Sequence, residues 1–517
     1  MSSKQIERAI TRRTLLKGFA SGLAMATLAA CGGTPVPATT APQPAAPTAT
    51  SAPAATQAAP EPTATTQAPT AAEPTATTQA PTAAEPTATT QAEAPAATVA
   101  QAVNLEFWCA WNLGEDVDRV QKMLDLFKQV QPNINVKLIG GGPGGGDYNE
   151  LLLSRIAAGT APDAATLFTP PVGFAARGSL DVIDDLMDAA QYARHDKFWP
   201  TVLATCQFRG KTFGLPFSAS SYAIFYNADW MKEAGLPTDR ESFPKTFDDM
   251  KALSAKFVKW EGSNLKTAGF QPWSENWIYP VWSALNGSQF FSAKAEKYTI
   301  NSSENVALLD SWVQWLDDQY NGDIEYINSL GTWDVGDSGN WYKKMTPFGQ
   351  GGAWNTSYSF MKLDKIGFTW DVAKFPVGPN GKKSVTGFWP NWFVQPAGGK
   401  HRKEAFLLNE YMCTVGMATW YKNVFDTPAW LDFPTNVITQ NLIDNVGQEK
   451  AQDLHNFFRN YLEDTAEVWT SPIEDFGTDQ INRAFDQALH KTKKPQEALD
   501  EAQKITQAKL EETLKSA

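Results

Sequence analysis

The chain has 517 residues, a net charge of -12, four cysteines and nineteen tryptophans. The acidic balance argues against nucleic acid as a partner. The three cysteines that follow Cys31 are far apart and odd in number, which argues against a disulfide framework. The part of the chain from about Val103 is long enough for two lobes, because typical domains have about 100–200 residues.

The first 31 residues have the features of an export signal. Thr11-Arg12-Arg13-Thr14-Leu15-Leu16-Lys17 is a twin-arginine motif, and an apolar stretch from Gly18 to Ala30 follows it. The stretch is shorter than the roughly 20 residues that span a bilayer. It ends in Leu28-Ala29-Ala30-Cys31-Gly32, which resembles a bacterial lipobox, whose cysteine becomes the lipid-bearing N-terminus. We therefore expect a lipoprotein anchored through Cys31 on the outer face of the cytoplasmic membrane.

Residues 32–102 are predicted to be a disordered linker. The segment is composed mainly of Ala, Pro, Thr and Gln, and the twelve residues from Glu61 to Ala72 recur from Glu73 and again, in part, from Glu85. So few large apolar side chains cannot offset the entropy lost on ordering. The prolines favour extended conformations. We expect this stalk to hold a folded domain, residues 103–517, away from the membrane.

The folded part begins with a pattern typical of an α/β protein. Val103 to Trp108 and Ile134 to Ile139 alternate as strands, and Val117 to Gln129 between them has helical spacing at Val120, Leu124 and Phe127. Strand, helix and strand at this spacing predict a βαβ unit and a parallel sheet. The glycine-rich run from Gly140 to Gly146 lacks the lysine and hydroxyl of a phosphate loop, so we interpret it as a flexible turn.

Further elements follow along the chain. A helix is predicted from Tyr148 to Ala158 and a strand from Ala164 to Phe168. Thr246 can cap a helix that runs to about Trp260. The other predicted helices span Ser302 to Asp318, which is strongly amphipathic, Ile481 to Leu489, and Pro495 to Leu514.

Several short motifs occur in an order and spacing that are specific together. They are Ala157-Ala158-Gly159-Thr160-Ala161-Pro162-Asp163, Gly210-Lys211-Thr212-Phe213-Gly214-Leu215-Pro216, Phe225-Tyr226-Asn227-Ala228-Asp229, Ala234-Gly235-Leu236-Pro237, Pro244-Lys245-Thr246-Phe247, Gln350-Gly351-Gly352-Ala353-Trp354 and Gln496-Glu497-Ala498-Leu499-Asp500-Glu501-Ala502. Through them the chain resembles the solute-binding proteins of carbohydrate ABC importers, the maltose-binding-like family.

This resemblance implies an α/β, two-lobed type II periplasmic-binding-protein fold with the ligand in a cleft between the lobes. Lobe 1 would take about residues 103–216 and 375–430, and lobe 2 about residues 217–374 and 431–517. The crossings between the lobes would lie near Leu215–Ser218 and Val372–Pro376. The family is not enzymatic, and the resemblance implies neither a cofactor nor a metal.

The resemblance also places ligand-contacting loops on this sequence. The candidate ligand residues are Trp111, Asn112, Phe168, Thr169, Ser220, Tyr222, Trp273, Glu275, Asn276, Trp277, Ser357, Tyr358, Phe360, Trp389 and Asn391. Tryptophan stacks on the apolar face of a sugar ring, and Asn, Ser and Glu bind its hydroxyls. We interpret Trp354 mainly as a packing residue. The maltose binder's own charged and tyrosine ligands are mostly absent, so its substrate does not carry over.

The resulting hypothesis is a monomeric binding protein that captures a neutral sugar or oligosaccharide and delivers it to an ABC transporter permease. No basic cluster lines the predicted loops, which disfavours a phosphorylated ligand. One alternative is a binding protein for a peptide or another polar nutrient.

The other alternative is an exported glycoside-active enzyme. Such an enzyme needs two carboxylates about 5–10 Å apart, and no motif identifies such a pair. The four histidines lack the spacing of a metal site, and GxSxG, CxxC and phosphate-loop motifs are absent from the sequence.

Overall fold

The computed structural model describes residues 102–111, 115–140, 148–466 and 470–516. The predicted signal, Cys31, nearly all of the linker, Asn112 and most of the glycine-rich turn lie outside these ranges. Residues 99–517 form one compact unit. Within its described part, no helix is long and apolar enough to cross a bilayer.

Lobe 1 is built on a five-stranded sheet with the strand order β2-β1-β3-β15-β6. Val103 pairs with Ile134 in parallel register, which confirms the predicted βαβ unit. β15 runs antiparallel to both of its neighbours, so the sheet is mixed. The strands are β1 (Val103–Cys109), β2 (Ile134–Gly140), β3 (Ala164–Leu167), β6 (Gly214–Pro216) and β15 (Trp392–Val394). Helices that pack around this lobe include α2 (Glu115–Val130), α3 (Tyr148–Ala157), α13 (Arg402–Cys413) and α14 (Met417–Tyr421).

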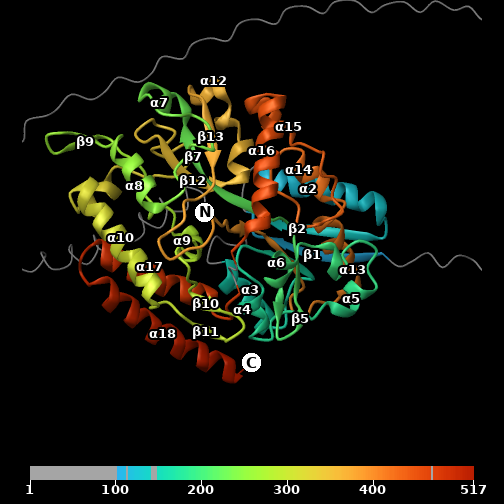
Figure 1. Cartoon of the computed structure of the whole chain (residues 1–517). Helices are drawn as coiled ribbons and strands as arrows, with labels where there is room; N and C mark the ends of the chain where they lie inside the picture. Colours follow the sequence, from blue (N-terminus) through green and yellow to red (C-terminus); the bar gives the residue numbers. More distant parts are fainter. Residues whose placement is uncertain (1–101, 112–114, 141–147, 467–469, 517) are drawn as a thin grey trace, which may run out of the picture. The chain divides into compact units, whose positions relative to one another are not determined.

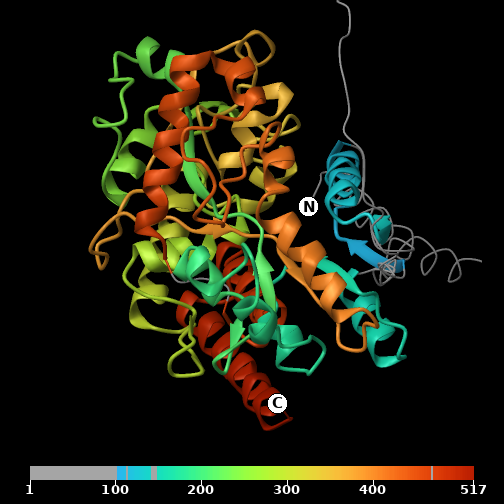
Figure 2. The ribbon, with the colours of Figure 1, turned by 90° about the vertical axis from the view of Figure 1, so that its right-hand side faces the viewer.

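Lobe 2 is built on an antiparallel sheet around the long, fully buried strand β7 (Ser220–Asn227). β7 lies between β12 (Phe348–Gly352) and β13 (Trp370–Ala373), and β14 (Phe388–Trp389) pairs with its first two residues. Three helices that pack on one another, α10 (Ser303–Tyr320), α17 (Glu474–Leu489) and α18 (Pro495–Ser516), form one side of this lobe (Figure 1, Figure 2). The other helices associated with this lobe include α8 (Phe247–Ala255), α9 (Tyr279–Leu285), α11 (Ile324–Ser329), α15 (Gln440–Val446) and α16 (Gln448–Tyr461).

Shorter elements connect these parts. They are α4 (Val172–Ala175), α5 (Asp184–Asp188), η1 (His195–Lys197), α6 (Pro200–Ala204), β4 (Gln207–Phe208), β5 (Lys211–Thr212), α7 (Ala228–Glu233), β8 (Lys259–Glu261), β9 (Asn264–Thr267), η2 (Asn276–Ile278), β10 (Phe291–Ser292), β11 (Lys297–Tyr298), η3 (Ala353–Ser357), η4 (Ser359–Met361), α12 (Leu363–Ile366) and η5 (Leu462–Asp464).

The chain crosses between the two sheets along two adjacent segments. The first crossing, residues 217–219, joins β6 to β7. The second crossing lies beside it, because the backbone N–H of Ser218 donates to the carbonyl of Pro390 over 2.8 Å. After β13 the chain stays bonded to lobe 2, where the N–H of Val377 donates to the carbonyl of Lys245. These hydrogen bonds place the second crossing near residues 390–391 rather than near Val372–Pro376.

One predicted helix is too long. α8 begins at Phe247 with the hydroxyl of Thr246 capping it, as predicted, but it ends at Ala255 instead of near Trp260. Trp260 lies in β8, which forms a hairpin with β9. Gly262 has φ +61° in the turn of this hairpin, and Trp260 favours the extended conformation, so the local sequence supports a hairpin over a longer helix.

The cores of both lobes are rich in indole rings. Six tryptophans are less than 2% exposed: Trp108, Trp282, Trp312, Trp341, Trp370 and Trp392. Trp312 and Trp315 are buried on α10, which confirms the amphipathic helix predicted there. Cys109, Cys206 and Cys413 are buried and free, and burial raises the pKa of the Cys109 thiol to about 12. The described cysteines therefore act as small core residues.

Candidate ligand-binding site

Four aromatic side chains from four separate segments meet beside the crossings, and we call them the aromatic cluster: Tyr222, Trp277, Trp354 and Trp389. Trp277 lies at the centre, with its ring centroid 4.8 Å from Tyr222, 5.9 Å from Trp354 and 6.2 Å from Trp389. Tyr222 is fully buried, and the three indoles are half-buried. The cluster thus combines a buried base with indole surface that remains accessible.

Two glycines make room for the aromatic cluster. A Cβ atom on Gly352 would lie 2.1 Å from the ring of Trp354. A Cβ atom on Gly387 would lie 2.7 Å from the ring of Tyr222. Any larger side chain at either position would force a ring to move, so these glycines help to set the shape of the cluster.

The short turn η2 carries polar groups into the same region. The indole Nε1–H of Trp277 donates to the carboxylate of Glu275. Burial and the nearby carboxylate of Asp334 together raise the pKa of Glu275 to about 8, although the hydrogen bond from Trp277 lowers it. Asn276 is exposed between these two residues. Glu275, which precedes η2, and Asn276 and Trp277 within η2 therefore present a carboxyl group, an amide and an indole in one short segment.

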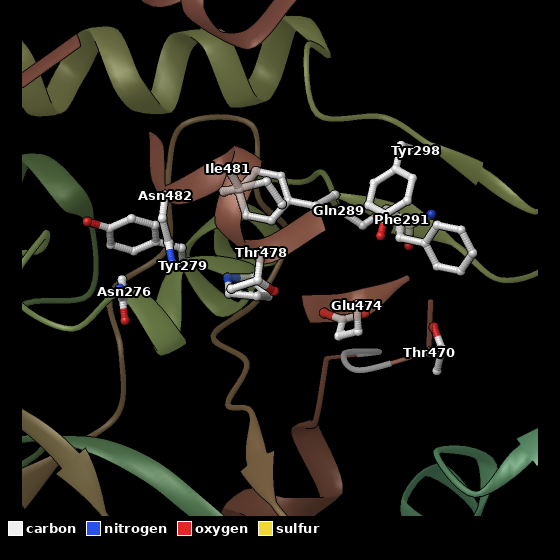
Figure 3. A pocket seen from close by; sticks show the side chains of 12 residues that line it. Asn276, Tyr279, Gln289, Phe291, Tyr298, Thr470, Glu474, Thr478, Ile481 and Asn482 are labelled. Atoms are coloured by element: carbon white, nitrogen blue, oxygen red, sulfur yellow. The ribbon is translucent and has the colours of Figure 1, made fainter. Parts of the chain in front are cut away.

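Asn276 also lines a cavity of about 40 Å³ between α9, β10, β11 and α17 (Figure 3). This volume is enough for a few water-sized groups. Asn482 lines the cavity, and its buried Oδ1 has no hydrogen-bond partner among the described residues. Burial raises the pKa of Glu474 to about 7. The other lining residues are Tyr279, Pro280, Gln289, Phe290, Phe291, Tyr298, Thr470, Thr478 and Ile481.

A second aromatic group lies at the carboxyl end of β1 in lobe 1. The ring of Trp111 is 4.9 Å from Trp420, 5.6 Å from Phe168 and 5.7 Å from Phe217, measured between centroids. Phe168 is 37% exposed, whereas Trp111 is only 8% exposed. Next to Phe168, the hydroxyl of Thr169 accepts a hydrogen bond from the side-chain amide of Asn149 on α3.

Tyr358 directly follows η3 and Phe360 lies in η4, with their rings 5.7 Å apart. Burial raises the pKa of the Tyr358 hydroxyl, and the carboxylates of Asp116 and Asp426 contribute to this shift. Asp116 belongs to α2 of lobe 1, where it forms an ion pair with Arg119. Tyr358 therefore lies within the electrostatic reach of α2 in lobe 1.

Several sequence-predicted ligand residues are bonded within the protein. Ser220 is fully buried and donates to Asp426, and Ser357 donates to the carbonyl of Trp354 and accepts from the backbone N–H of Phe425. Asn391 accepts from the indole of Trp389 and has a φ of 49°, in the left-handed region that asparagine tolerates.

Trp273 is also enclosed by the protein. It is 6% exposed, and its ring packs edge-on against Tyr320 in the lobe 2 core. The partly exposed candidates are Phe168, Thr169, Glu275, Asn276, Trp277, Tyr358, Phe360 and Trp389. These side chains are the better placed for direct contact with a ligand.

Other residues of the region had no signal in the sequence that set them apart. They are Asp116, Arg119, Trp420, Asp426, Glu474 and Asn482. Contacts with segments that are distant in the sequence bring these residues into the region. Asp116 and Arg119 additionally lie one helical turn apart on α2. Among the described residues, no group of three or more His, Cys, Asp or Glu side chains is arranged to hold a metal ion.

Residues 110–416 match the family described as bacterial extracellular solute-binding protein. This match covers more than half of the chain. The chain belongs to this family. The solute-binding protein thus has the two-lobed fold that its sequence motifs predicted, and the aromatic cluster and the Trp111 group each contact the first crossing, through Trp389 and Phe217 respectively.

The similarity to solved structures with the same fold covers nearly the whole described part of the chain. The solute-binding protein is similar to CpMnBP1 with mannotriose bound, at 21% identity and a TM-score of 0.65 over 78% of this chain and 99% of that one. It is also similar to the maltose/maltodextrin-binding domain from Bdellovibrio bacteriovorus bound to maltotriose, at 17% identity and a TM-score of 0.58 over 79% and 100% of the chains. At these identities the likeness establishes the fold.

Sequence relatives include the sn-glycerol-3-phosphate-binding periplasmic protein of Yersinia pestis. It is 30% identical over 198 residues, which cover 36% of this chain and 43% of that relative. A putative binding protein of Brucella abortus is 32% identical over 114 residues, or 22% and 26% of the two chains. The match thus spans less than half the length of these curated relatives.

Proposed function

We propose that the protein captures a neutral sugar or short oligosaccharide outside the cytoplasm and delivers it to the permease of an ABC importer. Its place of action would be the outer face of the cytoplasmic membrane, where the lipid on Cys31 would anchor it. The protein would act as a monomer and would release its ligand chemically unchanged.

The observation that carries this proposal is the aromatic cluster. Trp277, Trp354 and Trp389 expose indole surface within one group of touching rings. Such surface suits the apolar faces of sugar rings, because ligand sites combine apolar and aromatic lining with a few polar groups. Polar groups for hydroxyls, Glu275 and Asn276, come from the same turn as Trp277.

The charges of the region favour a neutral ligand over a phosphorylated one. Glu275 and Glu474 contribute carboxyl groups, whereas the cation of Arg119 is already paired with Asp116. A phosphate group would have to displace that ion pair or approach carboxyl groups, which costs free energy. Because a sequence relative is an sn-glycerol-3-phosphate-binding protein, any test of the ligand must include sn-glycerol 3-phosphate.

A thermal-shift screen of the purified protein tests the proposal. The panel would contain manno-, malto- and xylo-oligosaccharides, sn-glycerol 3-phosphate and short peptides. A ligand at 100 times its Kd adds about 2.7 kcal/mol of stability, so a binder is readily detected. We expect stabilisation by a neutral oligosaccharide, which chromatography then recovers intact. Stabilisation by sn-glycerol 3-phosphate or peptides alone would reject the proposal, and cleavage of the sugar would indicate an enzyme.

A further inference from the structure

A segment after α14 runs alongside the first crossing. The backbone N–H of Ala219 donates to the carbonyl of Thr427 over 2.6 Å, and the N–H of Ala429 donates to the carbonyl of Phe217 over 3.2 Å. Ser218 forms a further bridge with Pro428. Residues 425–429 therefore lie at the place where the chain passes from one sheet to the other.

Asp426 is the charged residue of this segment, and it is 5% exposed. Its Oδ1 accepts a hydrogen bond of 2.8 Å from the hydroxyl of Ser220, the first residue of β7. Its Oδ2 accepts a hydrogen bond of 2.8 Å from the indole Nε1–H of Trp420 on α14. One carboxylate thus ties the central strand of lobe 2 to a helix that packs on α2 of lobe 1.

The indole that Asp426 holds is the neighbour of Trp111. The ring of Trp420 lies 4.9 Å from Trp111 and 5.5 Å from Phe217 between centroids. Because an indole held by a hydrogen bond at one edge cannot rotate freely, the carboxylate fixes the surface against which Trp111 rests. Asp426 holds Ser220 and Trp420 at the same time because each of its two carboxylate oxygens accepts one hydrogen bond.

We propose that Asp426 is a positioning residue of the ligand site, which holds Trp420 against Trp111 at the junction between the lobes. Its effect on sugar affinity rests on the proposed function, but the contact itself can be tested without a ligand. An amide at this position is uncharged and has one acceptor oxygen in place of two, so it replaces the two charge-assisted hydrogen bonds of the carboxylate with weaker neutral ones.

The surroundings of Asp426 make this contact sensitive to pH. Burial raises the pKa of Asp426 to about 6, the donors Ser220 and Trp420 counteract the rise, and Asp116 and Arg119 on α2 act in opposite directions. Tyr358 and Tyr421 are further titratable groups within electrostatic reach of Asp426. Protonation of Asp426 removes the negative charge that strengthens its hydrogen bonds, so the hydrogen bond from Trp420 weakens as the pH falls through about 6.

Fluorine NMR of protein labelled with 5-fluorotryptophan tests the contact. Trp420→Phe identifies the Trp420 resonance by its disappearance. In the wild-type protein we expect this resonance to shift with pH with a midpoint near 6, and in Asp426→Asn we expect no such titration. Asp432→Asn is the matched control, because Asp432 lies on the same stretch but pairs with Lys197 at the surface. An unchanged titration in Asp426→Asn would overturn the proposal.

Sugar affinity gives the second readout. We expect Asp426→Asn to weaken binding about tenfold at pH 7.5 and to lose the decline below pH 6 that the wild type shows, while Asp432→Asn behaves like the wild type. Affinity that is unchanged in Asp426→Asn would reject the positioning role. If the wild type binds no sugar in the panel, the proposed function fails, and the NMR titration then decides the inference alone.

Ser220→Ala keeps the inference testable if Asp426→Asn does not fold. This variant removes one donor and leaves Trp420 bound to the carboxylate. Because the Ser220 hydrogen bond lowers the pKa of Asp426, we expect the midpoint of the Trp420 titration to move to higher pH. A midpoint that stays in place would show that Trp420 does not report on Asp426 and would overturn the proposal.

Discussion

The ring of Tyr222 meets the indole of Trp277 at an angle of 86° with 4.8 Å between the centroids. Tyr222 belongs to the buried central strand of lobe 2, so its ring is a fixed support against one side of the Trp277 indole. The indole is therefore held by the protein on one side while it stays half-exposed, which is the arrangement expected of a rigid stacking surface.

Trp277→Ala should weaken sugar binding at least tenfold, because the stacking partner and the support for Trp354 and Trp389 are lost together. Isothermal titration calorimetry with the best ligand of the panel measures the effect. Trp260→Ala is the control, since it removes a half-buried indole from the β8–β9 hairpin. Equal affinity in Trp277→Ala and Trp260→Ala would show that the aromatic cluster does not contact the ligand.

Gly352→Ala should weaken binding by displacing Trp354, because the added Cβ would lie 2.1 Å from that ring. Overpacking of this kind typically costs about 1–3 kcal/mol. The double variant Gly352→Ala/Trp354→Ala removes the clashing ring, so we expect it to regain stability but not affinity. Thermal unfolding and calorimetry distinguish these effects, and a stable, tightly binding Gly352→Ala protein would contradict the close approach.

Trp312→Ala should reduce stability by about 3–5 kcal/mol. Trp312 is 1% exposed and packs against Tyr279, Trp282 and Phe485 in the lobe 2 core. Urea unfolding measures the loss. Because Trp312 lies within the core, the folded fraction should bind sugar with nearly wild-type affinity, and a selective loss of affinity at full stability would refute this assignment.

The free energy of unfolding should fall as the pH rises from about 5 to 7, because the buried carboxyl group of Glu474 loses its proton over this range. Burial raises its pKa from 4.5 to about 7, so the folded state binds the proton more tightly than the unfolded chain. This contribution is fully present below 4.5, is lost as the pH rises through the raised value and is constant above it. Glu474→Gln should flatten this slope in urea unfolding at several pH values. The exposed Glu463→Gln serves as control, and an identical slope in Glu474→Gln would rule out the effect.

Cys31→Ala should abolish membrane anchoring, because the lipid would have no attachment site. We expect the variant in the medium or as an unprocessed precursor, whereas the wild type sediments with membranes. Cys413→Ala, which changes a buried cysteine of the folded part, should leave the anchoring intact. A Cys31→Ala protein that is processed normally and stays with the membrane would exclude the lipobox.

The regular elements could be predicted from the sequence because their signals are local. The alternation from Val103 and the helical spacing at Val120, Leu124 and Phe127 predicted β1 and α2 within a few residues. The end of α8 was missed, because a turn at Gly262 competes with a continued helix. The two-lobed architecture required motifs whose order extends along the whole chain.

The site could be predicted only in outline. Sequence motifs indicated the loops of Trp277 and Trp389, but contact between these two residues depends on folding across more than a hundred residues of chain. The same holds for Asp426 and Ser220, which are 206 positions apart. No local pattern distinguishes a serine that binds a buried carboxylate from one that binds a ligand, so the environment of Ser220 emerged only from the structure.

The three buried free thiols bear on where the chain can fold. Cys109, Cys206 and Cys413 each lie in the packed interior without a disulfide partner, and burial keeps their pKa values high, which suppresses the reactive thiolate. The native state of this part of the chain thus needs neither an oxidant nor a disulfide isomerase. Its folding is equally feasible in a reducing cytoplasm and in an oxidising exterior, with the same set of covalent bonds in both.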